Sequence, residues 1–224
     1  MKDFLAFAQE RRSVRKFSSK SVSDEDIADC LLAASFAPSA GDIQPWEFVV
    51  IRDVSVRDAI VSSCEDAGWL STAPVLVIIL LNVHRAVSYH GEEGVLWSRD
   101  SVCAAIQNFL LAATSRGLGS CWVASFQSAS ILEAIGAPDS VLPVAVLPLG
   151  FSAQSLIEKD VNPLDQMTFW DVYGQRRSTE DINMEFKNFG ELVHKRLSDT
   201  KRSLEESPPS FISSLKEKIS SWKK

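Results

Sequence analysis

The chain has 224 residues and a net charge of −6, with hydrophobic residues at 46% and charged residues at 23%. These values are ordinary for a globular protein, and the negative charge argues against nucleic acid as a partner. The longest apolar run, residues 73–81, is far shorter than the ~20 residues that a membrane-spanning helix needs. We therefore expect a cytoplasmic protein with no transmembrane segment. The four cysteines form no CxxC pair, which predicts buried, reduced thiols rather than a disulfide framework or a zinc site.

The spacing of apolar residues and the positions of turn residues predict a mixture of helices and strands. Ser23 followed by three acidic residues is typical of a helix N-terminus. Because strands and helices mix without a regular βαβ alternation, we predict an α+β fold. The elements expected in chain order are helix 3–12, helix 24–36, strand 47–52, helix 55–67, strand 74–82, helix 98–116, strand 120–125 and strand 144–151.

Three of these elements carry more specific expectations. Residues 74–82 are apolar on both faces, which predicts a central strand. Residues 98–116 are apolar nearly all round, so this helix should be buried on every side, either in the centre of the domain or between two subunits. Pro148 places the last strand at a sheet edge or a bulge.

The composition changes near residue 175, which predicts a main domain at 1–175 and a C-terminal helical extension at 176–224. The first part is acidic and the second mildly basic. In the extension, five apolar residues share one helical face, which either packs on its own dimer or binds a membrane surface or a partner. They are Phe211, Ile212, Leu215, Ile219 and Trp222.

Several common catalytic motifs are absent from the sequence. It contains no GxxxxGK[ST] loop, no HExxH and no GxSxG elbow, and its three histidines lack metal-ligand spacing. The Gly117-Leu118-Gly119 turn follows a helix, so it is not a dinucleotide fingerprint. An enzyme with this sequence would take its chemistry from a bound cofactor.

A basic segment, Arg11-Arg12-Ser13-Val14-Arg15-Lys16-Phe17, lies at the end of the first predicted helix. One interpretation is a basic helix C-terminus that the helix dipole favours. The other is a phosphate site, because alternation in an extended chain places Arg11, Ser13 and Arg15 on one side. The residues of this segment alone leave both open.

Together with three later segments, the basic segment resembles the nitroreductase family of FMN enzymes. These segments are 37–48 (APSAGDIQPWEF), 105–122 (AIQNFLLAATSRGLGSCW) and 147–151 (LPLGF). The resemblance implies a three-layer α-β-α sandwich with an antiparallel-rich central sheet. It also implies an intertwined, obligate homodimer with two equivalent FMN sites at the interface.

The resemblance also assigns cofactor-binding roles by position. Arg11, Arg12 and Ser13 would hold the phosphate and ribityl end, and Arg15 would lie at the pyrimidine edge of the flavin. The backbone of Ala124 and Ser125 would face flavin N5.

A loop of small residues, Pro38, Ser39 and Ala40, would come from the other subunit and pack on the flavin ring. Asp42 stands where the family more often has Asn, and Gln44 follows it in the same loop. In segment 158–164, where the family is often rich in Lys and Arg, Lys159 is the basic residue. No catalytic acid or base is assigned, and residues 64–72 are given no flavin contact.

The predicted function is transfer of hydride from NADH or NADPH, through FMN, to a small-molecule acceptor such as a nitroaromatic or a quinone, by a ping-pong mechanism. A dehydrogenase or a reductive dehalogenase on the same scaffold is a variant of it. The alternatives are a non-catalytic flavin-binding protein and an enzyme that consumes its own FMN. Trp69, Tyr89 and Trp97 form either a stacking wall for the acceptor or ordinary core, and His90 is expected in a solvated loop.

Overall fold

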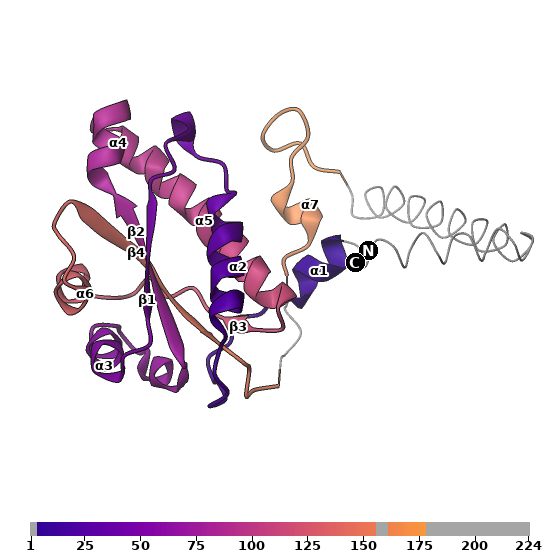
Figure 1. Ribbon diagram of the computed structural model, residues 1–224. Helices are drawn as coiled ribbons and strands as arrows, with labels where there is room; N and C mark the ends of the chain where they lie inside the picture. Colours follow the sequence, from indigo (N-terminus) through magenta and orange to yellow (C-terminus); the bar gives the residue numbers. More distant parts are fainter. Residues whose placement is uncertain (1–3, 156–160, 178–224) are drawn as a thin grey trace, which may run out of the picture. The chain divides into compact units, whose positions relative to one another are not determined.

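An antiparallel sheet lies at the centre of the computed structural model, which describes residues 4–155 and 161–177 (Figure 1). Its strand order is β1-β2-β4-β3, and every neighbouring pair is antiparallel. The strands are β1 (Trp46–Ile51), β2 (Val75–Asn82), β3 (Gly119–Ser120) and β4 (Val141–Gly150).

Strand β2 is central, as its two apolar faces predicted. It pairs with β1 on one side and β4 on the other, and its residues 75–81 are all buried. Its odd-numbered residues, such as Val77, pack in one core cluster, and its even-numbered residues, such as Ile78, pack in another. Alternation along one strand therefore supplies both layers of the core.

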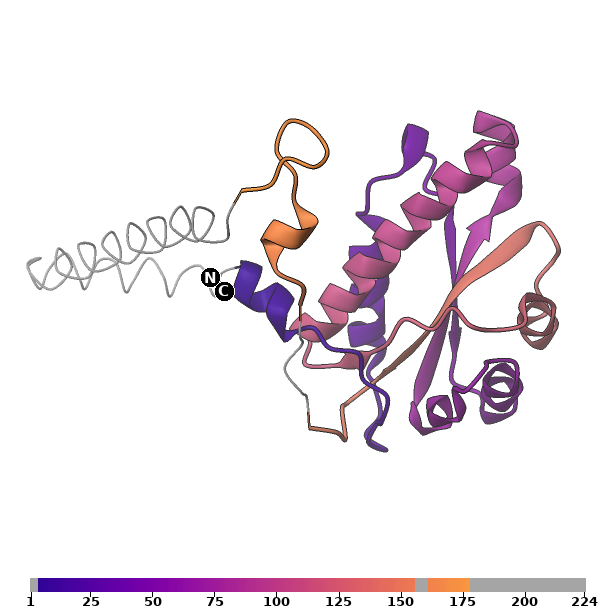
Figure 2. The same cartoon turned by 180° about the vertical axis from the view of Figure 1, so that it is seen from behind.

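Helices cover both faces of the sheet, which confirms the three-layer α+β prediction (Figures 1 and 2). α2 (Asp24–Ser35) and α5 (Gly94–Ser115) lie on one face, and α3 (Val54–Ser62) and α6 (Ser128–Ile135) lie on the other. The shorter elements are α1 (Phe4–Glu10), α4 (Val83–His90) and the 3-10 turns η1 (Ala40–Asp42) and η2 (Gly68–Thr72).

Side-chain caps fix where three of these helices begin. The side chain of Ser23 accepts from the Asp26 amide at the start of α2, as predicted. Asp53 and Asn82 do the same for α3 and α4. Each cap satisfies an amide that has no partner inside its helix.

Helix α5 begins at Gly94, four residues before the predicted start. Its buried side includes Ile106 and Phe109, each 0% exposed. The opposite side, with Cys103, Gln107 and Leu111, is only partly covered by this chain. Burial on every side is therefore not reached in a single chain, and the other expectation, a helix shared between two subunits, is left open.

Strand β4 is not an edge strand, which corrects one of the two expectations drawn from Pro148. The other, a bulge, is found in β4 as a register shift at Val144, and not at Pro148 itself. Both polar backbone groups of Val146 bond to Val123, at 2.9 and 3.2 Å, so the nitrogen of Pro148 faces the same side of β4. On that side the chain leaves the ladder between Ser120 and Val123. The missing N–H of proline falls at this gap, where no ladder bond is lost.

Other predicted boundaries also need correction. Strand 120–125 is reduced to the two residues of β3 and an isolated bridge at Val123. Helix 55–67 ends at Ser62 and is followed by η2. Helices α4 and α6, each eight residues long, were not predicted.

By contact density the chain divides into two units, Met1–Lys159 and Asp160–Lys224. In the second unit the described residues include α7 (Leu164–Met167), and the guanidinium of Arg176 lies 4.7 Å from the ring centre of Phe169. The predicted boundary at residue 175 stays a prediction. Lys159 and the apolar face at 211–222 lie outside the described residues.

Candidate functional site

The basic segment is fixed to the sheet by backbone contacts. Ser13 forms a parallel bridge with Ser120 of β3, and the Val14 amide donates to the Ser120 carbonyl at 3.0 Å. Val14 and Phe17 are 2% and 6% exposed, so two apolar side chains anchor the segment in the core. A Cβ at Gly119 would lie 2.6 Å from Val14 Cγ2. The close approach of the segment to β3 therefore requires glycine there.

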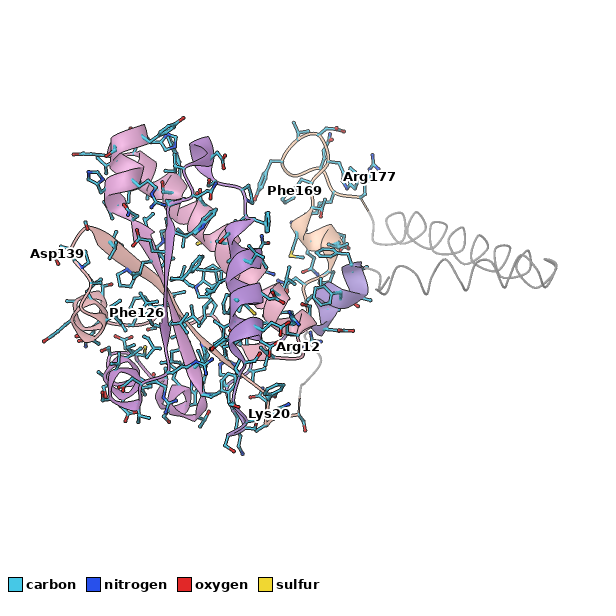
Figure 3. All side chains as sticks on the ribbon, viewed as in Figure 1. Arg12, Lys20, Phe126, Asp139, Phe169 and Arg177 are labelled. Atoms are coloured by element: carbon cyan, nitrogen blue, oxygen red, sulfur yellow. The ribbon has the colours of Figure 1, made fainter. Side chains whose placement is uncertain are left out.

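The charged side chains of this segment are directed to different places. Because Val14 points inward, its neighbours Ser13 and Arg15 face the other way. The Arg15 guanidinium lies 6.0 Å from the ring centre of Trp69, and the Arg15 amide donates to Gln154 Oε1 at 2.9 Å. Arg12 instead donates to the carbonyls of Gln9 and Arg11, at the end of α1 (Figure 3). Arg12 therefore matches the interpretation as a basic helix C-terminus. Ser13 and Arg15 lie on one side of the segment, as the phosphate-site interpretation requires.

A pocket of about 660 Å³ lies beside Arg12, between α1, the end of α5 and β3. The buried hydroxyl of Ser120, in the adjacent strand, has no hydrogen-bond partner among the described residues. The pocket is lined by Ala6, Gln9, Glu10, Arg12, Val14, Thr114, Gly117, Leu118, Gly119 and Ser152.

The predicted N5-facing residues, Ala124 and Ser125, are exposed. The Ser125 hydroxyl donates to Glu65 Oε2 at 2.8 Å, and its carbonyl accepts from the Glu65 amide at 3.1 Å. Neither the Ala124 nor the Ser125 amide donates to any residue that the structure describes. These two N–H groups could therefore bind an acceptor atom of a ligand.

The sequence assigned no flavin contact to residues 64–72, yet this segment supports both parts of the site. Glu65 holds Ser125, Trp69 lies under Arg15, and Thr72 Oγ1 accepts from the Phe17 amide at 3.3 Å. The partners are more than 50 residues apart in sequence, so no local pattern could have shown these contacts. Figure 3 shows Phe126, which follows Ser125, on the α3 and α6 side of the sheet.

The loop of small residues lies elsewhere in the chain. The Ala40 amide donates to Ser101 Oγ, in the first half of α5, at 3.1 Å. Ser13, in contrast, lies beside Ser120, beyond the end of α5. Ser101 and Ser115 are about 20 Å apart along the helix at ~1.5 Å per residue, and both views show η1 and β3 at opposite ends of α5. One chain therefore does not bring Pro38, Ser39 and Ala40 to the basic segment.

The charge of Asp42 is partly satisfied within its own loop. Its carboxylate accepts from the side-chain amide of Gln44 at 3.3 Å, and the Gln44 backbone amide donates to Ser39 Oγ at 3.0 Å. Asp42 and Gln44 both have left-handed backbones, with φ of 53° and 48°. The loop is thus shaped by bonds among its own polar side chains.

His90 does not lie in a solvated loop, which corrects the expectation from sequence. It is the last residue of α4 and is half-buried. Its ring makes edge contacts with Tyr89 and Trp97, with ring centres 4.6 and 5.5 Å apart. The reason is that helix α4, which sequence patterns missed, carries it against α5.

The Cys64 thiol, near the site, is a poor nucleophile. Cys64 precedes Glu65, and burial raises the pKa of its thiol to about 11. All four cysteines are free, as expected, and Cys30, Cys64 and Cys121 are buried. Among the described residues, no group of three or more His, Cys, Asp or Glu could hold a metal ion. In the same ranges, no helix is long and apolar enough to cross a membrane.

In both sequence and structure, the chain is similar to proteins named as nitroreductases. The family model described as Nitroreductase family matches residues 8–69 and 62–151. An Archaeoglobus fulgidus protein named as an NADH dehydrogenase/NAD(P)H nitroreductase is 31% identical over 74% of this chain and 92% of its own. A Desulfovibrio desulfuricans nitroreductase solved in complex with FMN has a TM-score of 0.68 and 27% identity, over 77% of this chain and 99% of its own. Pig iodotyrosine deiodinase 1 is 27% identical, over 74% of this chain and 67% of its own.

Proposed function

The chain belongs to the nitroreductase family, and we propose that it is an FMN-dependent oxidoreductase that takes hydride from NADH or NADPH. The observation that carries the proposal is the arrangement around residues 11–15. An arginine-rich segment is tied to β3, and residues 64–72 link it to Ala124 and Ser125, whose amides have no acceptor in the part of the chain that the structure describes.

The described residues fit FMN in charge and in hydrogen bonding. Arg11 and Ser13 offer a cation and a hydroxyl to a phosphate. Ser120 offers a buried hydroxyl that still lacks a partner among the described residues. Exposed amides at Ala124 and Ser125 suit an acceptor atom such as flavin N5. The site thus has donors for both ends of the cofactor.

When bound, FMN would supply the redox chemistry, the transfer of two electrons from the nicotinamide to the acceptor by ping-pong turnover. The role of this chain is to bind and orient. The guanidinium of Arg15 would stabilise negative charge at the pyrimidine edge of the reduced ring. Trp69 holds that guanidinium in place from the other side.

We also propose that the working unit is a homodimer. The Ala40 turn and the basic segment lie at opposite ends of α5, so a turn that packs on the flavin ring must come from a second copy. The partly covered side of α5, with Cys103 and Leu111, supplies an apolar surface for that copy. The interface would then complete two equivalent sites.

The similarity to iodotyrosine deiodinase favours a wider choice of acceptor. Reductive removal of halide from a halophenol consumes the same two electrons as reduction of a quinone. A halogenated tyrosine therefore belongs beside nitroaromatics and quinones among the acceptors to be tested.

Arg15→Gln tests the placement of the flavin. We expect the FMN dissociation constant of the full-length protein to rise roughly 10- to 100-fold, because a charged hydrogen bond is worth about 1.5–3 kcal/mol. Arg52→Gln is the matched control, since Arg52 pairs with Asp24 at 2.6 Å instead. Titration of the flavin-free proteins with FMN, followed by flavin fluorescence, measures both. Equal affinity in the two variants would place the flavin elsewhere.

A further inference from the structure

One residue in the Ala40–Asp42 turn, Ala40, is held by side chains from two helices, one on each of its two flanking peptide groups. The Ala40 amide donates to Ser101 Oγ on α5 at 3.1 Å, and the Ala40 carbonyl lies 3.2 Å from His90 Nε2 on α4. Ser101 Oγ in turn donates to the Trp97 carbonyl at 2.8 Å. Since the His90 ring rests edge-on against Trp97, the contacts form a closed circuit around Ala40.

Two glycines allow this circuit to close. A Cβ at Gly41 would lie 2.6 Å from Tyr89 Cε1 and 3.0 Å from the His90 ring, and Gly41 has φ of +61°. A Cβ at Gly94 would lie 2.1 Å from His90 Cβ. The turn and α5 therefore press against His90 from two sides, which leaves its ring little freedom to move.

Helix α4 also holds the other end of the loop. Arg85 Nη1 donates to the Gln44 carbonyl at 2.5 Å. Between the two attachments, Asp42 and Gln44 adopt left-handed backbones that are unfavourable for residues other than glycine. A backbone of this kind persists only where its surroundings impose it.

We propose that His90 and Ser101 are positioning residues that set the Ala40 turn in the shape that packs against FMN. The inference rests on the proposed function, because the flavin contact of the turn belongs to that proposal. His90 acts with its proton on Nε2, where the ring donates to the Ala40 carbonyl, and Ser101 accepts from the amide of the same residue. The peptide groups before and after the Ala40 Cα are thereby both fixed in direction.

A pair of substitutions separates the hydrogen bond of His90 from its packing. His90→Phe keeps a ring against Trp97 but leaves the Ala40 carbonyl without its donor. His90→Gln keeps an amide donor that can reach the same oxygen. We expect FMN affinity to fall about tenfold in His90→Phe and to stay within about twofold of wild type in His90→Gln. His84→Phe is the control, since His84 is an exposed histidine of the same helix.

Ser101→Ala tests the second attachment with the loss of a single oxygen. It should also weaken FMN binding, and the double variant His90→Phe/Ser101→Ala should bind only slightly more weakly than either single variant. Such non-additivity is expected because both bonds hold the same residue, Ala40, through adjacent peptide groups. If His90→Phe does not fold, the FMN affinity of Ser101→Ala alone tests the positioning role.

The measurements are FMN titration of the flavin-free, full-length proteins, the visible spectrum of the bound flavin, and thermal unfolding without flavin. Weaker FMN binding with an unchanged unfolding temperature supports the positioning role. Wild-type affinity in both His90→Phe and Ser101→Ala, or equal losses in His90→Phe and His90→Gln, overturns it. Failure of the wild-type protein to bind FMN would instead remove the proposed function itself.

Discussion

Replacing Gly119 with alanine should displace the basic segment from β3. The new Cβ would lie 2.6 to 2.9 Å from three side-chain atoms of Val14, whereas ordinary contacts begin near 3.4 Å. A β-branched valine cannot move away by changing rotamer alone. The backbone of residues 13–15 must therefore shift.

The size of the effect follows from what Val14 loses. The side chain is 2% exposed, and burial of a valine is worth about 1.5–3 kcal/mol. The bond from its amide to the Ser120 carbonyl contributes about 0.5–1.5 kcal/mol. Allowing for partial relaxation, we expect a loss of about 2–4 kcal/mol, which lowers the unfolding temperature by roughly 5–15 °C. FMN binding should weaken as well, because Ser13 and Arg15 move with the segment.

Gly68→Ala is the matched control. A Cβ at Gly68 meets no atom within 4 Å, and its backbone is not left-handed. Thermal unfolding by circular dichroism and FMN titration would be compared for the two variants. If Gly119→Ala is as stable as Gly68→Ala and binds FMN equally well, the close packing of Val14 against β3 is not what holds the segment.

Two further predictions concern the rest of the first unit. Arg116→Met should lower the free energy of unfolding by about 1 kcal/mol, because Arg116 pairs with Glu25, Asp26 and Asp29 at the surface. The loss should be smaller at high salt, which screens these pairs. Urea unfolding that shows no loss at low salt would contradict this. Cys30 and Cys64 should resist iodoacetamide at pH 8 in the folded protein and react in urea. Burial, with Asp26 nearby, raises the pKa of Cys30 to about 12, and burial raises that of Cys64 to about 11. Mass spectrometry of the labelled peptides measures this, and labelling of either thiol in the folded state would refute it.

Much of the fold could be predicted because it depends on local patterns. The run 74–82 identified the central strand, and Ser23 identified the start of α2. Pro148 gave a wrong expectation of an edge strand. A proline shows that one hydrogen bond of the ladder is missing, but not whether the strand lies at the sheet edge or beside a local gap in the neighbouring strand. Helices α4 and α6, which span little more than two turns each, were missed, although the seven-residue α1 was found.

The site was only partly predictable for a related reason. The basic segment and the loop of small residues are contiguous in sequence, so they could be recognised by resemblance. The residues that support them, such as Glu65, Trp69 and His90, act through contacts with distant parts of the chain. Such contacts depend on the tertiary arrangement, which a single sequence does not show.

Anaerobic mixing of the FMN-loaded protein with NADH or NADPH tests the central claim most directly. We expect the flavin band near ~450 nm to bleach with either nicotinamide and to return when an acceptor is added. A flavin that binds but is not reduced by either donor would contradict the proposed oxidoreductase and favour a flavin-binding protein.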